Sequence, residues 1–250
     1  MAQRLRGPDC SFRSVTPVSG APREVLEFDL PTYAEQTATL LEWVIRDSVL
    51  ARGVCRLVLA GGRTPGAVYR ALAKRPDMPW QSVEAYIGDE RCVLPTDADS
   101  NYRMIAETLL DAVPIPGAQI HRLRGELGAE AAAAEYDALL SPLPEPKFDL
   151  VLTGVGADGH TASLFPGDPL VTTTTAWAMS AVAPPSFTVA ERVGLSLRAL
   201  CSSRVLVVLC TGADKRAIRA AILSGAPAAR LLPAALVSGI DRTICVVDPI

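Results

Sequence analysis

The feature that most constrains the fold of this chain is an alternation of short apolar runs with longer amphipathic stretches. From residue 23 onward, apolar runs of strand length recur between stretches of helix length. This alternation is typical of a mostly parallel sheet whose two faces are covered by helices. We therefore predict a three-layer α/β fold, with a mostly parallel central sheet and helices on both faces.

The expected elements follow one another without a linker. Helices are predicted at residues 32–51, from 65 toward 76, from about 100 to 109, and at 129–140. Strands are predicted at residues 56–60, 83–87, 148–153, 193–197, 205–210 and 243–247. Because no stretch rich in Gly, Ser or Pro divides them, residues 23–250 are expected to form a single α/β domain. Residues 1–22 have no period and are expected to be a loose N-terminal extension without chemistry.

Charge and hydropathy exclude several classes of partner. The formal net charge is -3 and neither sign is concentrated in a block, which argues against a nucleic-acid partner. The longest apolar runs, such as residues 205–210, are far shorter than the roughly 20 residues that cross a bilayer. The N-terminus lacks an uninterrupted apolar segment ahead of a cleavage site. We expect a cytoplasmic protein that has no membrane partner.

Cysteine and histidine usage argues against a metal site. The six cysteines are Cys10, Cys55, Cys92, Cys201, Cys210 and Cys245. They show no C-x-x-C spacing and mostly lie in apolar runs, so we expect them to be reduced and mostly buried. The chain has two histidines and no H-E-x-x-H pattern, so a zinc site would need mostly carboxylates. We expect no metal and no cofactor.

Polar residues directly after strands are the main candidates for a binding site, because open parallel sheets bind ligands beyond the carboxyl ends of their strands. Residues 61–64 form one such stretch, in which Thr64 is expected to cap a helix and Pro65 to be its first residue. Free N–H groups at a helix N-terminus suit a phosphate. A tight strand-to-helix turn needs the same residue types, so both interpretations remain open.

A second such stretch, residues 154–163, contains G-x-G-x-x-G and His160. A dinucleotide fingerprint would continue into a helix and meet an acid about 20 positions on. Here Pro and Gly at residues 166–169 interrupt any helix that would follow the motif, and residues 172–175 include no Asp or Glu. His160 has a side chain whose ordinary pKa, near ~6.5, suits a base at neutral pH. It is either that base or a histidine bonded to loop backbone, whereas His121, at a short strand end, is expected to be structural.

Three further charged positions follow strands. Asp89 and Glu90 are adjacent and point apart if the strand continues through them, which disfavours a glycosidase pair. Arg91 either neutralises one of these carboxylates or binds an anion. Lys215 stands near the start of an expected helix, where the dipole disfavours a cation. A bound anion would relieve that conflict; otherwise Lys215 is a solvated surface residue.

Three ordered motifs resemble those of the 6-phosphogluconolactonase family, within the superfamily of glucosamine-6-phosphate isomerases and lactonases. The motifs are Ala60-Gly61-Gly62-Arg63-Thr64-Pro65, then Gly88-Asp89-Glu90-Arg91 with Ser100-Asn101-Tyr102, then residues 154–160 followed by Thr161-Ala162-Ser163-Leu164-Phe165-Pro166-Gly167. The resemblance covers residues 28–248. Isomerases of the superfamily are similar to D-G-H-I-A-F-N-E-P-G in the last motif, where this chain has Leu164 and Phe165 in place of Asn and Glu.

The resemblance implies a modified Rossmann-like fold and hydrolysis of 6-phospho-D-glucono-1,5-lactone to 6-phosphogluconate in the pentose phosphate pathway. The catalytic residues that it implies are His160, the general base that activates water, and Asp158. The substrate-binding residues that it implies are Gly61, Gly62, Arg63, Thr64, Asp89, Arg91, Arg192 and Lys215. The expected partner is a small phosphorylated sugar lactone, bound by a monomer or a small homo-oligomer.

One departure from the family pattern concerns Arg192. The family carries Ser-Pro-Lys-Pro-Pro closely followed by an arginine, whereas residues 181–185 here lack the lysine and Arg192 comes later. This predicts a weaker phosphate grip. Two alternative functions remain: a sugar-phosphate isomerase or deaminase, and a non-catalytic sugar-phosphate sensor.

Overall fold

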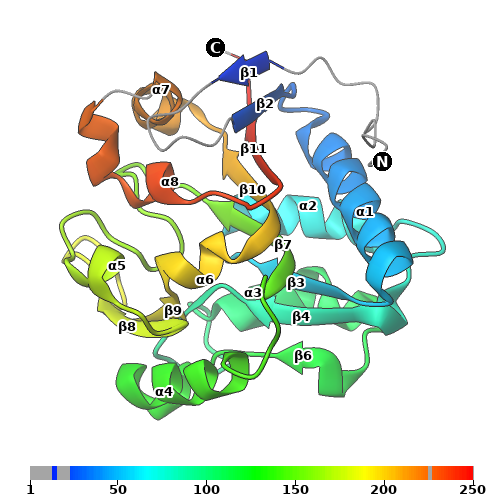
Figure 1. Cartoon of the computed structure of the whole chain (residues 1–250), viewed down its shortest axis with the longest axis horizontal. Helices are drawn as coiled ribbons and strands as arrows, with labels where there is room; N and C mark the ends of the chain where they lie inside the picture. The colour runs from blue at the N-terminus through cyan, green and yellow to red at the C-terminus, as the bar shows by residue number, and fades with distance from the viewer. Residues whose placement is uncertain (1–12, 16–22, 225–226, 250) are drawn as a thin grey trace.

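An eight-stranded sheet forms the centre of the computed structural model, which describes residues 13–15, 23–224 and 227–249 (Figure 1). The strands in spatial order are β1 (Arg13–Val15), β2 (Arg23–Glu27), β11 (Arg242–Val247), β10 (Ser203–Cys210), β7 (Phe148–Gly154), β3 (Cys55–Leu59), β4 (Val83–Ile87) and β6 (Ile120–His121). Neighbouring strands run parallel from β2 to β6, and β1 alone of the eight is antiparallel to its neighbour. The predicted mostly parallel sheet is confirmed.

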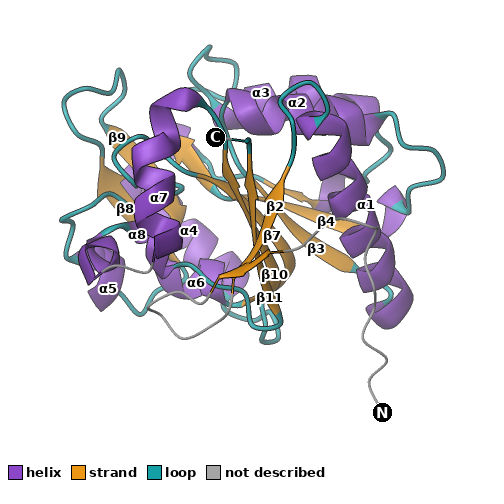
Figure 2. Cartoon of the chain, turned by 90° about the horizontal axis from the view of Figure 1, so that it is seen from above, coloured by secondary structure: helices purple, strands orange, loops and turns teal. Residues whose placement is uncertain are grey.

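Helices cover both faces of this sheet, as predicted (Figure 2). One face carries α1 (Tyr33–Arg52) and α2 (Arg63–Ala73), with α3 (Asn101–Thr108) packed against α2. The other face carries α4 (Ala129–Leu140), α6 (Leu197–Cys201), α7 (Arg216–Ser224) and α8 (Pro233–Leu236). Because both faces are covered, strands such as β7 are buried almost throughout and read as continuous apolar runs rather than alternating ones.

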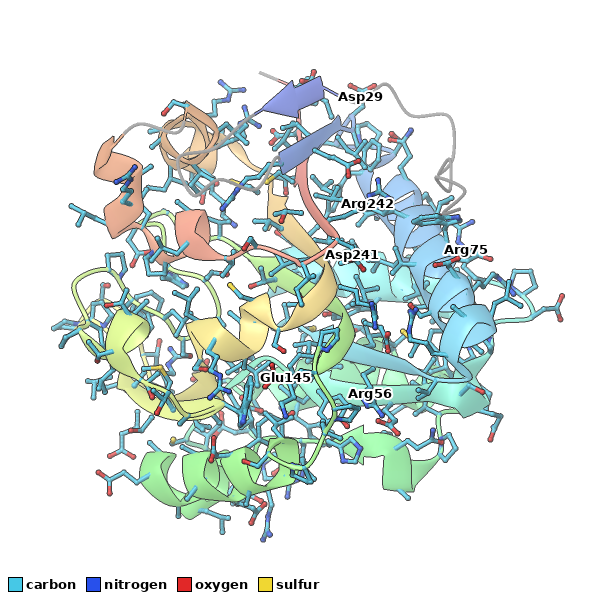
Figure 3. All side chains as sticks on the ribbon, in the orientation of Figure 1. Asp29, Arg56, Arg75, Glu145, Asp241 and Arg242 are labelled. Atoms are coloured by element: carbon cyan, nitrogen blue, oxygen red, sulfur yellow. The ribbon has the colours of Figure 1, made fainter. Side chains whose placement is uncertain are left out.

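Helix α1 illustrates how the sequence sets a packed element. Its buried face includes Leu40, Leu41, Val44 and Ile45, at the spacing that places side chains on one side of a helix. The helix ends at Gly53, whose φ of 77° is the left-handed conformation that favours glycine. Arg75, which follows α2, binds the Glu35 carboxylate of α1 at 3.0 Å and so joins the two helices at the surface (Figure 3).

Helix α2 begins earlier than the sequence predicted. Its first residue is Arg63 and its N-cap is Gly62, with φ of 104° and no side-chain cap. The prediction that Thr64 caps this helix and Pro65 starts it is therefore wrong. Pro65 is still in the first turn, where its missing N–H leaves no carbonyl without a partner. The backbone conformation at Gly62 is one that a residue with a side chain rarely adopts, so glycine sets where the helix starts.

A second, antiparallel sheet was not predicted. It consists of β5 (Asp89–Arg91), β9 (Glu191–Leu195) and β8 (Ala178–Val182), in that order, and it packs against α4. The strand predicted at 193–197 is β9, which ends at Leu195 because Ser196 caps α6 through Ala199 N. A short helix, α5 (Leu170–Thr173), precedes β8.

The N-terminal segment 1–22 is described only at residues 13–15. These residues form β1 and pair with β2, so this part of the expected loose extension is a strand. The rest of the extension lies outside the described residues.

The order of the strands places a crevice between β3 and β7. From β3 the chain continues through α2 to β4, whereas from β7 it continues through α6 to β10 on the opposite side. The two strands are neighbours in the sheet, with Leu57 opposite Leu150. Chains that leave two adjacent parallel strands in opposite directions open a crevice at the carboxyl ends of those strands, and ligands bind there. The two glycine-rich turns identified in the sequence follow these two strands.

Candidate active site

A cavity of about 400 Å³ opens at the carboxyl ends of β3, β4 and β7, and we call it the main cavity. This volume is within the range of small-molecule sites. Eight of the ten predicted site residues line it: Gly61, Gly62, Arg63, Thr64, Asp89, Arg91, His160 and Lys215. The remaining two, Asp158 and Arg192, lie outside its lining. The fold therefore brings together residues that follow four different strands.

Backbone hydrogen bonds close the turn that carries His160. Gly156 N donates to His160 O at 2.9 Å, and Gly159 N donates to Gly156 O at 3.0 Å. The Thr161 hydroxyl donates to Gly154 O at 2.8 Å, at the last residue of β7. The turn is thus fixed to the end of a buried strand, which holds the histidine in one place.

The imidazole of His160 is oriented by Asp158. Nδ1 lies 2.5 Å from Asp158 Oδ1, and the backbone N–H of His160 donates to the same oxygen at 3.1 Å. A carboxylate at Nδ1 favours the tautomer with its proton there, which leaves Nε2 as the lone-pair nitrogen. The side chain is 21% exposed, and the rings of Phe165 and Phe187 lie 5.2 Å and 5.4 Å from it. An aspartate–histidine pair of this kind can act as a general base.

The close approach of the ring depends on Gly156. A Cβ at this position would lie 2.1 Å from both Nδ1 and Cε1 of His160. Ordinary Cβ contacts begin near 3.4 Å, so a side chain here would displace the imidazole. At Gly156 the glycine-rich motif therefore makes space for the imidazole of His160.

Positive charge gathers around the start of α2. Arg63 is the first residue of this helix, and Lys215 reaches the main cavity from η5 (Ala213–Lys215), a single turn before α7. Among the described residues, no carboxylate oxygen lies within 4.0 Å of a side-chain nitrogen of either residue. Unpaired cations beside the free N–H groups of a helix N-terminus make a site that suits a phosphate.

Asp89 and Glu90 point apart, as the sequence predicted. Asp89 accepts hydrogen bonds from Asn101 Nδ2 at 3.1 Å and from the Ser163 hydroxyl at 2.8 Å. Glu90 is 2% exposed. It accepts hydrogen bonds from three backbone N–H groups, of Arg91, Asn101 and Tyr102, and from one hydroxyl. Burial raises the pKa of Glu90, and these four donors oppose the shift. Glu90 holds the start of α3, whereas Asp89 lines the main cavity.

Two further residues of the main cavity were not assigned a role from the sequence. Asn101 lies so close to Gly61 that a Cβ there would be 2.0 Å from Asn101 Oδ1. Phe187 lines the main cavity and packs against both His160 and Phe165. In the sequence, Gly61 was the one signal of this contact, because a glycine at the end of a strand can mark a place where another group approaches the backbone closely.

Arg192 does not line the main cavity. It is 6% exposed, its Nε donates to Val189 O at 2.9 Å, and its guanidinium lies 5.6 Å from the centre of the Phe187 ring. It is paired across the strands with Arg91. Burial lowers the pKa of Arg192, and the charge of Arg91 lowers it further.

The other histidine is remote from this chemistry. His121 is the last residue of β6, and its ring stacks on Tyr86 with 4.5 Å between the ring centres. Burial lowers the pKa of His121. It does not line the main cavity, so the chain has one histidine in a position to act there.

Metal-ligating clusters and membrane spans are both absent from the described part of the chain. No group of three or more His, Cys, Asp or Glu side chains there is arranged to hold a metal ion. Within the same residues, no helix has the length and apolarity needed to span a bilayer. The five cysteines described are free thiols, of which Cys55, Cys210 and Cys245 are buried; Cys10 lies outside the described residues.

Comparison with known proteins places the chain in a family. The model of the family described as glucosamine-6-phosphate isomerases/6-phosphogluconolactonase matches residues 29–245. The chain belongs to this family.

Relatives of this family resemble the chain over most of their length. A 6-phosphogluconolactonase of Streptomyces coelicolor is 33% identical over 249 residues, which cover 92% of this chain and 94% of the relative. A 6-phosphogluconolactonase of Mycobacterium leprae is 34% identical over 234 residues, which cover 88% of this chain and 93% of the relative. The crystal structure of a 6-phosphogluconolactonase from Thermotoga maritima superimposes with a TM-score of 0.79 at 30% identity, covering 90% of this chain and 98% of the other.

The residues after His160 differ from the isomerase pattern of this family. Leu164 and Phe165 are 1% and 5% exposed. Leu164 N donates to Thr161 O at 2.9 Å, and Phe165 packs on the imidazole of His160. The position at which the isomerase pattern carries a glutamate is therefore occupied by a buried aromatic ring.

Proposed function

We propose that this chain hydrolyses 6-phospho-D-glucono-1,5-lactone to 6-phosphogluconate, a step of the pentose phosphate pathway. The observation that carries the proposal is an oriented Asp158–His160 pair beside the same cavity as Arg63, Lys215 and the start of α2. A base at one place and an anion grip at another are what a phosphorylated lactone requires. The names of the relatives point to the same substrate.

In the proposed mechanism, His160 activates water. Nε2 takes a proton as the water oxygen bonds to the lactone carbonyl carbon, which gives a tetrahedral oxyanion. Collapse of this intermediate breaks the bond from that carbon to the ring oxygen, and the imidazolium returns its proton to the ring oxygen. Asp158 keeps the ring in the required tautomer and stabilises its cationic form. Proton transfer by a positioned group is typically worth about 10²–10⁴ in rate.

Positive groups would act at both ends of the substrate. The N–H groups at the start of α2, with Arg63 and Lys215, are the proposed phosphate ligands. Arg192 would join them after turning away from the Val189 carbonyl. Arg91 or backbone N–H groups would stabilise the oxyanion, which requires donors aimed at the developing charge. The phosphate then supplies binding energy remote from the reacting carbon, so we expect an unphosphorylated lactone to be a poor substrate.

The test is an assay of freshly generated 6-phosphogluconolactone, corrected for its spontaneous opening. We expect rapid acid release by the wild-type chain, and a His160→Ala variant that folds but turns over at least about 10²-fold more slowly. His121→Phe is the matched control, because it removes the other histidine and keeps a ring on Tyr86. Near-normal turnover by His160→Ala would remove His160 from the role.

The same preparation tests the alternative functions. Release of ammonia from glucosamine 6-phosphate would replace the lactonase proposal by a deaminase. Binding of the phosphorylated sugar acid without any turnover would indicate a sensor. We also propose that residues 23–250 act as a single domain in the cytoplasm, a location that suits the free thiols.

A further inference from the structure

A second cavity of about 330 Å³ lies on the other side of the α2 N-terminus, between α2 and α3. We call it the arginine cavity, because Arg63, Arg70 and Arg91 line it. Gly62, Arg63, Arg91 and Asn101 are shared with the main cavity, whereas Arg70 lines the arginine cavity alone. A substitution of Arg70 therefore alters the arginine cavity without changing a residue that lines the main cavity.

The guanidinium of Arg70 lies beside Gly66 at this cavity. A Cβ built on Gly66 would lie 4.0 Å from Arg70 Nη1, 3.3 Å from Met104 Sδ and 3.7 Å from Thr108 Cγ2. All four of these residues line the arginine cavity. The missing side chain at position 66 thus leaves space beside the Arg70 guanidinium, on the surface where α2 meets α3.

Among the described residues, no carboxylate forms an ion pair with the three arginines of this cavity, although the Glu90 carboxylate accepts hydrogen bonds from Ser100 and Asn101 of its lining, and Arg91 Nη1 donates to Asp99 O. No Asp or Glu is among the residues that line it. Arg63 and Arg70 make no hydrogen bond or ion pair to any described residue, and the buried Nε of Arg91 has no hydrogen-bond partner there either. By contrast, Arg46 and Arg103 on the same side of the molecule each pair with a glutamate of their own helix.

Like charges held together without an ion-pair partner favour binding of an anion. Arg91 is also paired with Arg192 across β5 and β9, which places a further cation beside Arg91. A guanidinium presents a planar fork of N–H donors that fits phosphate oxygens in pairs. A phosphate dianion would supply acceptors to several forks at once, and a buried unpartnered Nε–H gains most from such an acceptor.

We propose that the arginine cavity binds a second phosphate dianion, either free or as a small monoester, at Arg70, with Arg63 and Arg91 shared between this cavity and the main cavity. This goes beyond the proposed hydrolysis, which uses a single phosphate grip. The 330 Å³ volume leaves room for more than the phosphoryl group. The expected ligands are thus small phosphorylated compounds as well as inorganic phosphate.

The experiment is calorimetric titration of inorganic phosphate, and separately of methyl phosphate, at constant ionic strength set with chloride. Wild type is compared with Arg70→Gln and with Lys74→Gln, which removes a cation from the C-terminal end of α2 outside both cavities. Arg70 is exposed and unpartnered among the described residues, so neither variant is expected to lose the fold.

We expect wild type and Lys74→Gln to bind one equivalent more than Arg70→Gln, with the lost site weakened about 10-fold or more. Stronger binding of methyl phosphate than of phosphate at this site would indicate a monoester as the ligand, and the reverse would indicate the free ion. Superimposable isotherms for Arg70→Gln and wild type would overturn the proposal, as would a wild type that binds no phosphate. Lactone turnover does not enter these readouts, so a failure of the proposed function is detected separately.

Discussion

Replacing Gly156 by alanine should disable the proposed base while leaving the fold intact. The new Cβ would lie 2.1 Å from Nδ1 and Cε1 of His160, and an ordinary contact needs about 3.4 Å, so the ring must retreat by about 1.3 Å. The Asp158 oxygen that orients the ring would lie only 2.7 Å from the same Cβ. A displacement of about 1 Å in a catalytic group can cost about 10²-fold in rate. We therefore expect kcat/KM for the phosphorylated lactone to fall by about that factor.

The loss should appear in kcat rather than in KM, because the start of α2 and Lys215 are untouched. Gly156 is not among the described residues with positive φ, so alanine introduces no backbone strain and the stability should change by less than about 1 kcal/mol. Gly117→Ala is the matched control, since a Cβ there meets nothing within 4 Å. The assay is steady-state lactone hydrolysis with thermal unfolding alongside. A folded Gly156→Ala variant with kcat/KM within about threefold of wild type would refute the reasoning.

Three other expectations follow from single residues. Asp158→Asn should lower kcat by about 10²–10⁴ with little change in KM, because the amide no longer stabilises the cationic form of His160; steady-state kinetics that instead give a raised KM at unchanged kcat would contradict the orienting role. Glu90→Gln should lower the free energy of unfolding by about 1–3 kcal/mol in urea, because an amide has one acceptor oxygen for four donors; unchanged stability would show that these bonds contribute nothing net. Burial lowers the pKa of His121, so as pH falls below about 6.5 the unfolded chain binds the proton first and stability decreases. His121→Phe, which keeps a ring on Tyr86, should flatten this dependence between pH 7 and 5, and an identical slope for both proteins would exclude His121 as its source.

Most strands of the central sheet, and the candidate site residues that follow them, could be predicted because both depend on local sequence patterns. Strands buried on both faces, such as β7 and β10, are continuous apolar runs in the sequence. In a parallel sheet the polar residues that follow such runs meet at one edge. His160, Asp89 and Lys215 each follow a run of this kind, and all three line the main cavity.

The rest depends on contacts that a single stretch of sequence does not encode. The strand β8 contains Ala178, Met179 and Ala181, with no strong alternation, and it is stabilised by pairing with β9 and packing on α4. Gly61, which follows β3, is required by Asn101, the first residue of α3. Arg192 is turned toward Val189 and Phe187, and only the geometry of the second sheet decides which way that side chain points.

The position of β11 has a consequence for biosynthesis. This strand is far from β2 in the sequence, yet it pairs with β2 on one side and with β10 on the other. A ribosome delivers β2 before β11, so the early strand has no neighbour on that edge until the chain has been translated through residue 247. Deleting residues 242–247 would remove an internal strand and separate β2 from the rest of the sheet, so we expect the variant to be degraded by cellular proteases.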